Sequence, residues 1–161
     1  MEMVDIVDDN DNVIGKASRD EVYEKLLTHR IVHVIVFDKE NKMALQLRGI
    51  NVSFCPGHWS TSAGGHVRSG ETYEDAATRE YAEELGVKSR LEFFSKDLYK
   101  VAGRPNKILV TFKTTFGGPF DIDLDVVEKI EYFALDEIRN MIRKGEKFHP
   151  ELLFLLENHI L

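Results

Sequence analysis

The sequence has little of three things that mark particular classes of protein. Its single cysteine, Cys55, excludes a disulfide within the 161-residue chain. Its longest apolar run, Leu152 to Leu156, is far shorter than the roughly 18 residues that a membrane-spanning helix requires. The first residues are acidic and lack the basic-then-apolar order of a signal peptide. We therefore expect a soluble, cytoplasmic protein that makes no membrane contact.

An excess of basic residues is also missing. The chain has 28 acidic and 21 basic side chains, and its formal net charge is −7. Because proteins that bind a nucleic-acid backbone need a basic face, no nucleic-acid polymer is expected as a partner. An acidic chain can still bind small anions where a divalent metal inverts the local charge. The length fits one domain, residues 1–161, and no repeat or low-complexity linker divides it.

Apolar and turn residues alternate in a pattern that predicts strands mixed with helices. Strands are expected at residues 4–7, 13–16, 31–37, 43–47, 59–63, 91–99, 108–115 and 129–134. Helices are expected at residues 20–27, 72–86 and 136–144, and a last one opens at His149-Pro150. The first two strands flank a polar turn and form a hairpin. This order of elements implies an α/β or α+β sandwich.

The clearest predicted helix carries three glutamates on one face. Thr72 is typical of an N-cap and Gly86 of a C-cap. Glu80, Glu83 and Glu84 are spaced i, i+3 and i+4, so their carboxylates project from the same side and repel one another.

No basic residue is expected to neutralise this acidic face. Arg79 lies about 100° around the helix from Glu80, which predicts that it does not compensate the carboxylates. Hard oxygen ligands in an incomplete cage suit Mg²⁺ or Mn²⁺. A solvated acidic helix face is the other interpretation, and the surrounding residues decide between the two.

Those surrounding residues resemble the Nudix box at every fixed position over residues 65–87. Its fixed positions here are Gly65, Glu71, Arg79-Glu80, Glu83-Glu84 and Gly86-Val87, with the softer departure Tyr81 in a slot that usually holds Ile, Leu or Val. The resemblance implies a Nudix-type α/β/α sandwich with a mixed sheet between helices. It also implies a metal-dependent hydrolase that cleaves the diphosphate bond of a nucleoside diphosphate, alone or linked to another moiety.

Roles of individual residues follow from the same resemblance. Glu80 and Glu84 are expected to bind the metal, together with the backbone carbonyl of Gly65. Glu83 is a further ligand or a catalytic base. Arg79 and Glu71 resemble the pair that braces the loop against the helix, which is an orienting role.

Residues outside the helix are weaker candidates. Glu128 precedes a strand at a place where the resemblance implies a further glutamate that holds a metal or acts as a base; an exposed acidic residue is the other interpretation. Arg48 ends the second buried strand, and His66 follows Gly65, so both are candidates for phosphate contact. Trp59 could stack on a base or belong to the core. His33, inside an apolar strand, is interpreted as structural and neutral.

The flanking segments resemble the isopentenyl-diphosphate-isomerase-like branch over roughly residues 3–135. In those isomerases an acid/base cysteine precedes the position of Gly65, where this chain has Gly64. Their partner glutamates align near Pro105–Lys107, where this chain has no carboxylate. Hydrolysis is therefore expected over isomerisation. A catalytically silent nucleotide-binding domain is a further alternative, against which the complete set of box glutamates argues. Many relatives pair as homodimers, so a homodimer is compatible with the resemblance.

Overall fold

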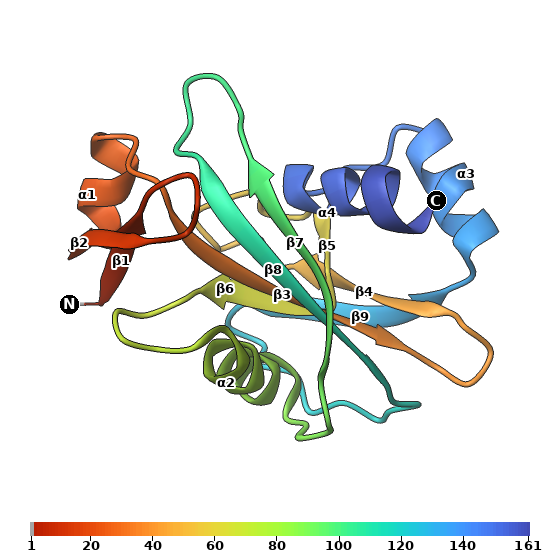
Figure 1. Cartoon of the computed structure of the whole chain (residues 1–161). Helices are drawn as coiled ribbons and strands as arrows, with labels where there is room; N and C mark the ends of the chain where they lie inside the picture. Colours follow the sequence, from red (N-terminus) through yellow and green to blue (C-terminus); the bar gives the residue numbers. More distant parts are fainter. Residues whose placement is uncertain (1) are drawn as a thin grey trace.

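The computed structural model describes residues 2–161 and contains all of the predicted helices and strands (Figure 1). The strands are β1 (Met3–Val7), β2 (Val13–Ser18), β3 (His29–Phe37), β4 (Met43–Arg48), β5 (Trp59–Ser60), β6 (Ala63–His66), β7 (Glu92–Tyr99), β8 (Lys107–Thr115) and β9 (Val127–Phe133). The helices are α1 (Arg19–Glu24), α2 (Tyr73–Leu85), α3 (Leu135–Arg143) and α4 (Pro150–Leu155), which continues as a π-helical turn, Leu156–Ile160. The strand predicted at 59–63 is in fact two short strands. None of the helices in residues 2–161 is long and apolar enough to cross a membrane.

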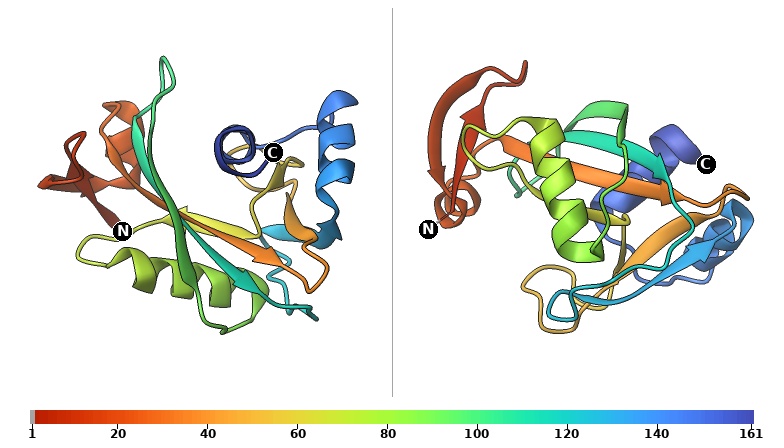
Figure 2. Two further views of the ribbon diagram at one scale, coloured as in Figure 1. Left: turned by 45° about the vertical axis from the view of Figure 1, so that its right-hand side comes forward. Right: turned by 90° about the horizontal axis from the view of Figure 1, so that it is seen from below.

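A mixed sheet separates α2 from α3 and α4, which lie on its opposite face (Figures 1 and 2). Its main strand order is β5-β4-β3-β8-β7, with β6 paired to β3 and β9 paired to β4. The β3–β8 pair is parallel and the other pairs are antiparallel. The strands β1 and β2 form the predicted N-terminal hairpin outside this sheet. The α+β architecture with a mixed sheet is thus confirmed.

The central strand β3 divides the core into two parts. Its side chains alternate across the sheet, as they do in any strand. Val32 and Val34 pack in the cluster that includes Tyr81 of α2. Ile35 packs in the second cluster, with residues of α3 and α4. The same alternation directs His33 towards α4.

The sheet opens beside β3, and this opening positions the site. Strand β4 pairs with β3 only at Phe37 and Met43. From Ile31 to Val34, β6 takes the place of β4 along the same edge of β3. Strands β3 and β4 therefore diverge beyond this pair, and a space is left between them.

Candidate active site

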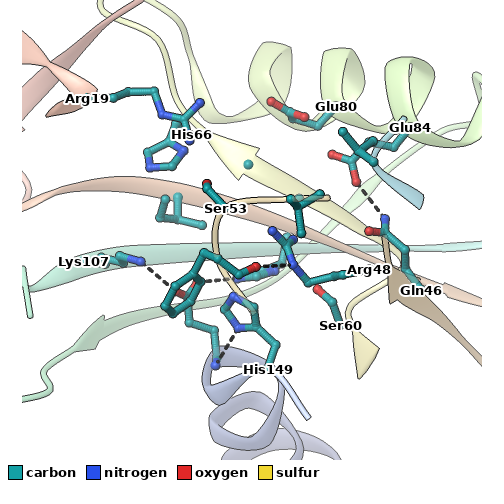
Figure 3. Close-up of a pocket in the computed structure, with 18 of the residues that line it drawn as sticks. Arg19, Gln46, Arg48, Ser53, Ser60, His66, Glu80, Glu84, Lys107 and His149 are labelled. Carbon is teal, nitrogen blue, oxygen red and sulfur yellow. Dashed lines mark hydrogen bonds and ion pairs between the residues drawn. The ribbon is translucent and has the colours of Figure 1, made fainter. Parts of the chain in front are cut away.

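A cavity of about 760 Å³ occupies the place where β4 leaves β3 (Figure 3). Side chains from α1, β3, β4, α2 and α4 line it, together with residues of the loops that follow β4 and β7. A space of this size is in the range of roughly 300–1,000 Å³ that small-molecule sites occupy.

Helix α2 forms one wall of the cavity, and its ends are capped as predicted. The hydroxyl of Thr72 accepts a hydrogen bond from the backbone N–H of Asp75 at 3.1 Å. Gly86 ends the helix in the left-handed conformation, with φ of 66°. Tyr81 is 1% exposed and anchors the helix on the sheet, so it packs inward although this slot usually holds an aliphatic residue. Once this face is buried, Glu80, Glu83 and Glu84 line the cavity.

Glu84 lies in surroundings that disfavour its charge. Its Oε1 accepts a hydrogen bond from the Nε2 of Gln46 at 2.8 Å. The carboxylate is partly exposed to the cavity, but desolvation and the neighbouring Glu80 raise its pKa well above the usual value for a glutamate. Two carboxylates therefore lie side by side with more negative charge than the protein compensates.

Two glycines let the chain pass close to these carboxylates. A Cβ at position 65 would collide with the carboxylate of Glu80. A Cβ at position 64 would lie 2.8 Å from the carbonyl oxygen of Val32. Gly65 therefore lets the backbone of β6 lie against Glu80, and Gly64 lets β6 pair closely with β3.

The prediction that Arg79 cannot compensate the acidic face is wrong. Its Nη1 lies 2.7 Å from Oε1 of Glu80 and 3.6 Å from Oε2 of Glu83. The long side chain bends back along the helix, and Glu83 is four residues further on, within the usual reach of such pairs. The guanidinium also donates to both oxygens of Glu71, at 2.8 and 2.9 Å, and to the carbonyl of His66 at 3.1 Å. Arg79 thus ties the glycine loop to the helix, while Glu84 has no ion pair within residues 2–161.

The oxygen atoms at this wall suit a hard cation in an open site. No group of three or more His, Cys, Asp or Glu side chains in residues 2–161 is already gathered as a metal cage. Glu83, one of the three predicted ligands, has a half-exposed side chain that turns towards Arg79. Glu80 and Glu84 beside the Gly65 backbone make an incomplete oxygen set, which Mg²⁺ accepts because it keeps waters and binds substrate oxygens.

Across the cavity lies a buried ion pair that the sequence did not reveal. Glu151 of α4 is 3% exposed. It accepts hydrogen bonds from Nε2 of His33 at 2.9 Å and from Nζ of Lys107 at 2.8 Å. Burial alone would raise the pKa of Glu151, but these two donors lower it well below the usual range. His33, interpreted as a neutral structural residue, is buried but bonded to an ionised carboxylate.

Glu151 was missed because it is 118 residues from His33 and 44 from Lys107. One signal was present: a lysine that begins an apolar strand requires a nearby carboxylate. The segment near Pro105–Lys107 lacks a carboxylate of its own, yet α4 supplies one there.

The remaining predicted residues divide into two groups. Arg48 and His66 line the cavity as expected. The Nε of Arg48 donates to the carbonyl of Phe54 at 2.9 Å. His66 bonds to the hydroxyl of Tyr23 at 2.8 Å, and burial lowers its pKa to about 2, so its ring is neutral.

Trp59 and Glu128 are not among the residues that line the cavity. Trp59 is 8% exposed and packs edge-on against Phe133, so of its two interpretations the structure favours a core residue over one that stacks on a base. In β9, Glu128 is the extra residue of a bulge between the Leu47–Lys129 and Arg48–Val127 pairs, and its side chain is exposed. Asp123, in the loop before β9, lines the cavity instead.

The chain is similar to known proteins along most of its length. The NUDIX domain family matches residues 27–156. An uncharacterized Nudix hydrolase of Yersinia pestis is 31% identical over 159 residues, which cover 95% of this chain and 82% of the relative. Isopentenyl-diphosphate Delta-isomerase 2 of Photorhabdus laumondii is 33% identical over 148 residues, which cover 89% of this chain and 84% of that one.

Solved structures show the same fold. The DR0079 protein of Deinococcus radiodurans superposes with a TM-score of 0.85 over 99% of this chain and 100% of its own, at 21% identity. The chain belongs to the Nudix family, and its resemblance to the isomerase-like branch of that family is confirmed.

Proposed function

We propose that this protein hydrolyses the diphosphate bond of a nucleoside diphosphate, or of a nucleoside diphosphate linked to another group, with Mg²⁺ or Mn²⁺. The observation that supports this most strongly is the pair Glu80 and Glu84. Its negative charge exceeds what Arg79 compensates, and the pKa of Glu84 is raised because its charge is desolvated beside Glu80 with no cation paired to it. Membership of the Nudix family supports a hydrolase.

The chain's own residues hold the reacting groups in place. Glu80 and Glu84 would hold the cation with the Gly65 carbonyl, and Glu83 is the candidate for a further ligand or general base. When bound, a divalent cation neutralises charge on the diphosphate and acidifies a water molecule. Gln46 fixes the carboxylate of Glu84, and Arg79 fixes that of Glu80. Such positioning and charge stabilisation provide most of the rate in phosphoryl transfer.

Isomerisation is a second candidate because one relative is named an isopentenyl-diphosphate isomerase. Two observations favour hydrolysis. A thiol cannot be accommodated at position 64 without moving the Val32 carbonyl, which lies 2.8 Å from where a Cβ would be. The carboxylate near Lys107 is Glu151, whose two buried donors hold it ionised and leave it poorly suited to exchange protons with a substrate.

A substrate panel with a matched pair of variants tests the proposal. Nucleoside diphosphates and their conjugates are incubated with Mg²⁺, and released phosphate and nucleotide are measured. The wild type and Glu74→Gln, an exposed acid on the same helix, are expected to turn over at least one compound. Glu84→Gln is expected to lose this activity. Tight binding without turnover would indicate a silent nucleotide-binding domain, and conversion of isopentenyl diphosphate to its isomer would indicate an isomerase.

A further inference from the structure

The side of the cavity opposite α2 has a surplus of positive charge around Phe54. The guanidinium carbon of Arg104 lies 4.6 Å from the centre of the Phe54 ring, and Nζ of Lys107 lies 5.9 Å from it. Arg48 donates to the carbonyl of Phe54. Within residues 2–161, Glu151 is the one carboxylate that forms an ion pair with any of these three cations. Three positive groups and one negative group therefore meet here.

Arg104 is an exposed residue that contacts two aromatic rings, and within residues 2–161 its guanidinium donates no hydrogen bond to the protein. It lies on the loop between β7 and β8, and its guanidinium packs over Tyr23 at 5.6 Å as well as over Phe54. A cation–π contact needs no hydrogen bond from the guanidinium, so the contacts with Tyr23 and Phe54 use none of its N–H donors. Arg79, by contrast, donates hydrogen bonds to Glu71, Glu80 and the carbonyl of His66. Arg104 thus offers a fork of donors that suits a phosphate.

One further donor, His149, faces the same space as Lys107. The Nδ1 of His149 accepts from the backbone N–H of Glu151 at 3.1 Å. Burial lowers the pKa of His149 to about 4, so its ring is neutral and its one hydrogen is on Nε2. Lys107 gives one of its three hydrogens to Glu151. Figure 3 shows Lys107 and His149 across the cavity from Glu80 and Glu84.

We infer that this basic side is a second anion subsite and that the substrate carries a phosphate in addition to the diphosphate that is cleaved. This inference rests on the proposed function, because both groups share one cavity. The acidic wall needs a metal before it can accept an anion, whereas the basic side attracts one directly. The further phosphate is either the terminal phosphate of a nucleoside triphosphate or a phosphate monoester elsewhere on a dinucleotide. A cavity of about 760 Å³ has room for such a molecule.

Matched pairs of substrates test the inference with Mg²⁺ present. One pair is a nucleoside triphosphate and its diphosphate, and the other is NADPH and NADH, which differ by one phosphate monoester. The phosphate-bearing member of one pair is expected to have a kcat/KM about tenfold higher or more, as a charge-assisted bidentate contact provides. Which pair shows the preference identifies the position of the phosphate. Arg104→Ala is expected to bring the ratio towards one, while Arg143→Ala, an exposed arginine of α3, leaves it unchanged.

Binding without metal provides a readout independent of turnover. In EDTA, the wild type is expected to bind the phosphate-bearing member more tightly, and Arg104→Ala is expected to lose that difference without a change in melting temperature. Equal rates and affinities within both pairs, or ratios that Arg104→Ala does not alter, overturn the inference. Hydrolysis without any phosphate preference would leave the proposed function standing and remove the subsite. An Arg104-dependent binding preference without hydrolysis of any compound would do the reverse.

Discussion

Glu84 and Glu151 line the same cavity in opposite electrostatic surroundings. Desolvation and the adjacent Glu80 raise the pKa of Glu84. At Glu151 the hydrogen bond from His33 and the charge of Lys107 outweigh burial and lower the pKa. One carboxylate lacks a cation, and the other has its own. The comparison teaches that residue type and burial do not distinguish a binding residue from a structural one, whereas the charges beside it do.

The largest expected effect is the loss of activity in Glu84→Gln. The substitution keeps the side-chain shape and an oxygen that can accept from Gln46, but it removes the charge that would hold a cation. We expect kcat to fall by about a hundredfold or more, beyond what loss of an outer contact to a metal ligand costs. Turnover with Mg²⁺ and circular dichroism measure activity and folding together. Full turnover in a folded variant would mean that α2 is not the catalytic wall.

Glu151→Ala is expected to act on stability instead. Removing the carboxylate leaves Lys107 and His33 buried without their acceptor, which lowers the free energy of unfolding by about 3–5 kcal/mol. Denaturant unfolding measures this change. The double variant Glu151→Ala/Lys107→Met is expected to recover part of the loss, since it no longer buries an unpaired ammonium group. A single variant as stable as the wild type would contradict the structural role of this pair.

Arg79→Ala is expected to have an intermediate effect on the acidic wall. Without its guanidinium, Glu80 and the glycine loop lose the contacts that fix them. The Mg²⁺ concentration for half-maximal turnover is expected to rise by about tenfold to a hundredfold. Arg79→Lys should recover little of this, because one ammonium group cannot bridge Glu71, Glu80 and a carbonyl together. An unchanged Mg²⁺ requirement in Arg79→Ala would show that the brace is dispensable.

The smallest expected effect is a difference in pH dependence. Glu151 has a lowered pKa in the folded protein, so its stabilisation is present above the ordinary glutamate value of 4.5 and is lost as the pH falls through the folded value. The pH dependence of stability that arises from Glu84 has the opposite sign. In metal-free protein its stabilisation is present at low pH and is lost as the pH rises through the raised pKa of the folded state. Melting temperatures in EDTA should therefore lose their slope below pH 4.5 in Glu151→Ala and their slope above pH 4.5 in Glu84→Gln. Parallel curves for both variants and the wild type would contradict the comparison.

Local features of the chain were predictable from sequence. The caps of α2 at Thr72 and Gly86, and the side of the helix that Glu80, Glu83 and Glu84 share, depend on neighbouring residues and on helix geometry alone. The apolar pattern of β3 likewise predicted a buried strand. The angle between Arg79 and Glu80 around the helix is correct for the backbone. The prediction made from that angle was wrong because a flexible arginine side chain reaches back to both glutamates.

Features that depend on distant segments were not predictable in the same way. Glu151 meets Lys107 because β8 runs parallel to β3 and α4 packs over the same face, and no local pattern encodes that meeting. The direction of the Trp59 side chain depends on how the short strand β5 packs, and that of Glu128 depends on the irregular pairing of β9. The resemblance to a family motif thus indicated the acidic wall, while the basic side emerged only from the fold.

Metal binding tests the central claim most directly. Mn²⁺ is titrated into wild type, Glu84→Gln and Glu74→Gln, and bound ion is measured by electron paramagnetic resonance. Wild type and Glu74→Gln are expected to bind Mn²⁺ alike, and Glu84→Gln is expected to bind it much more weakly. Equal Mn²⁺ binding by all three proteins, or none by the wild type, would contradict this claim.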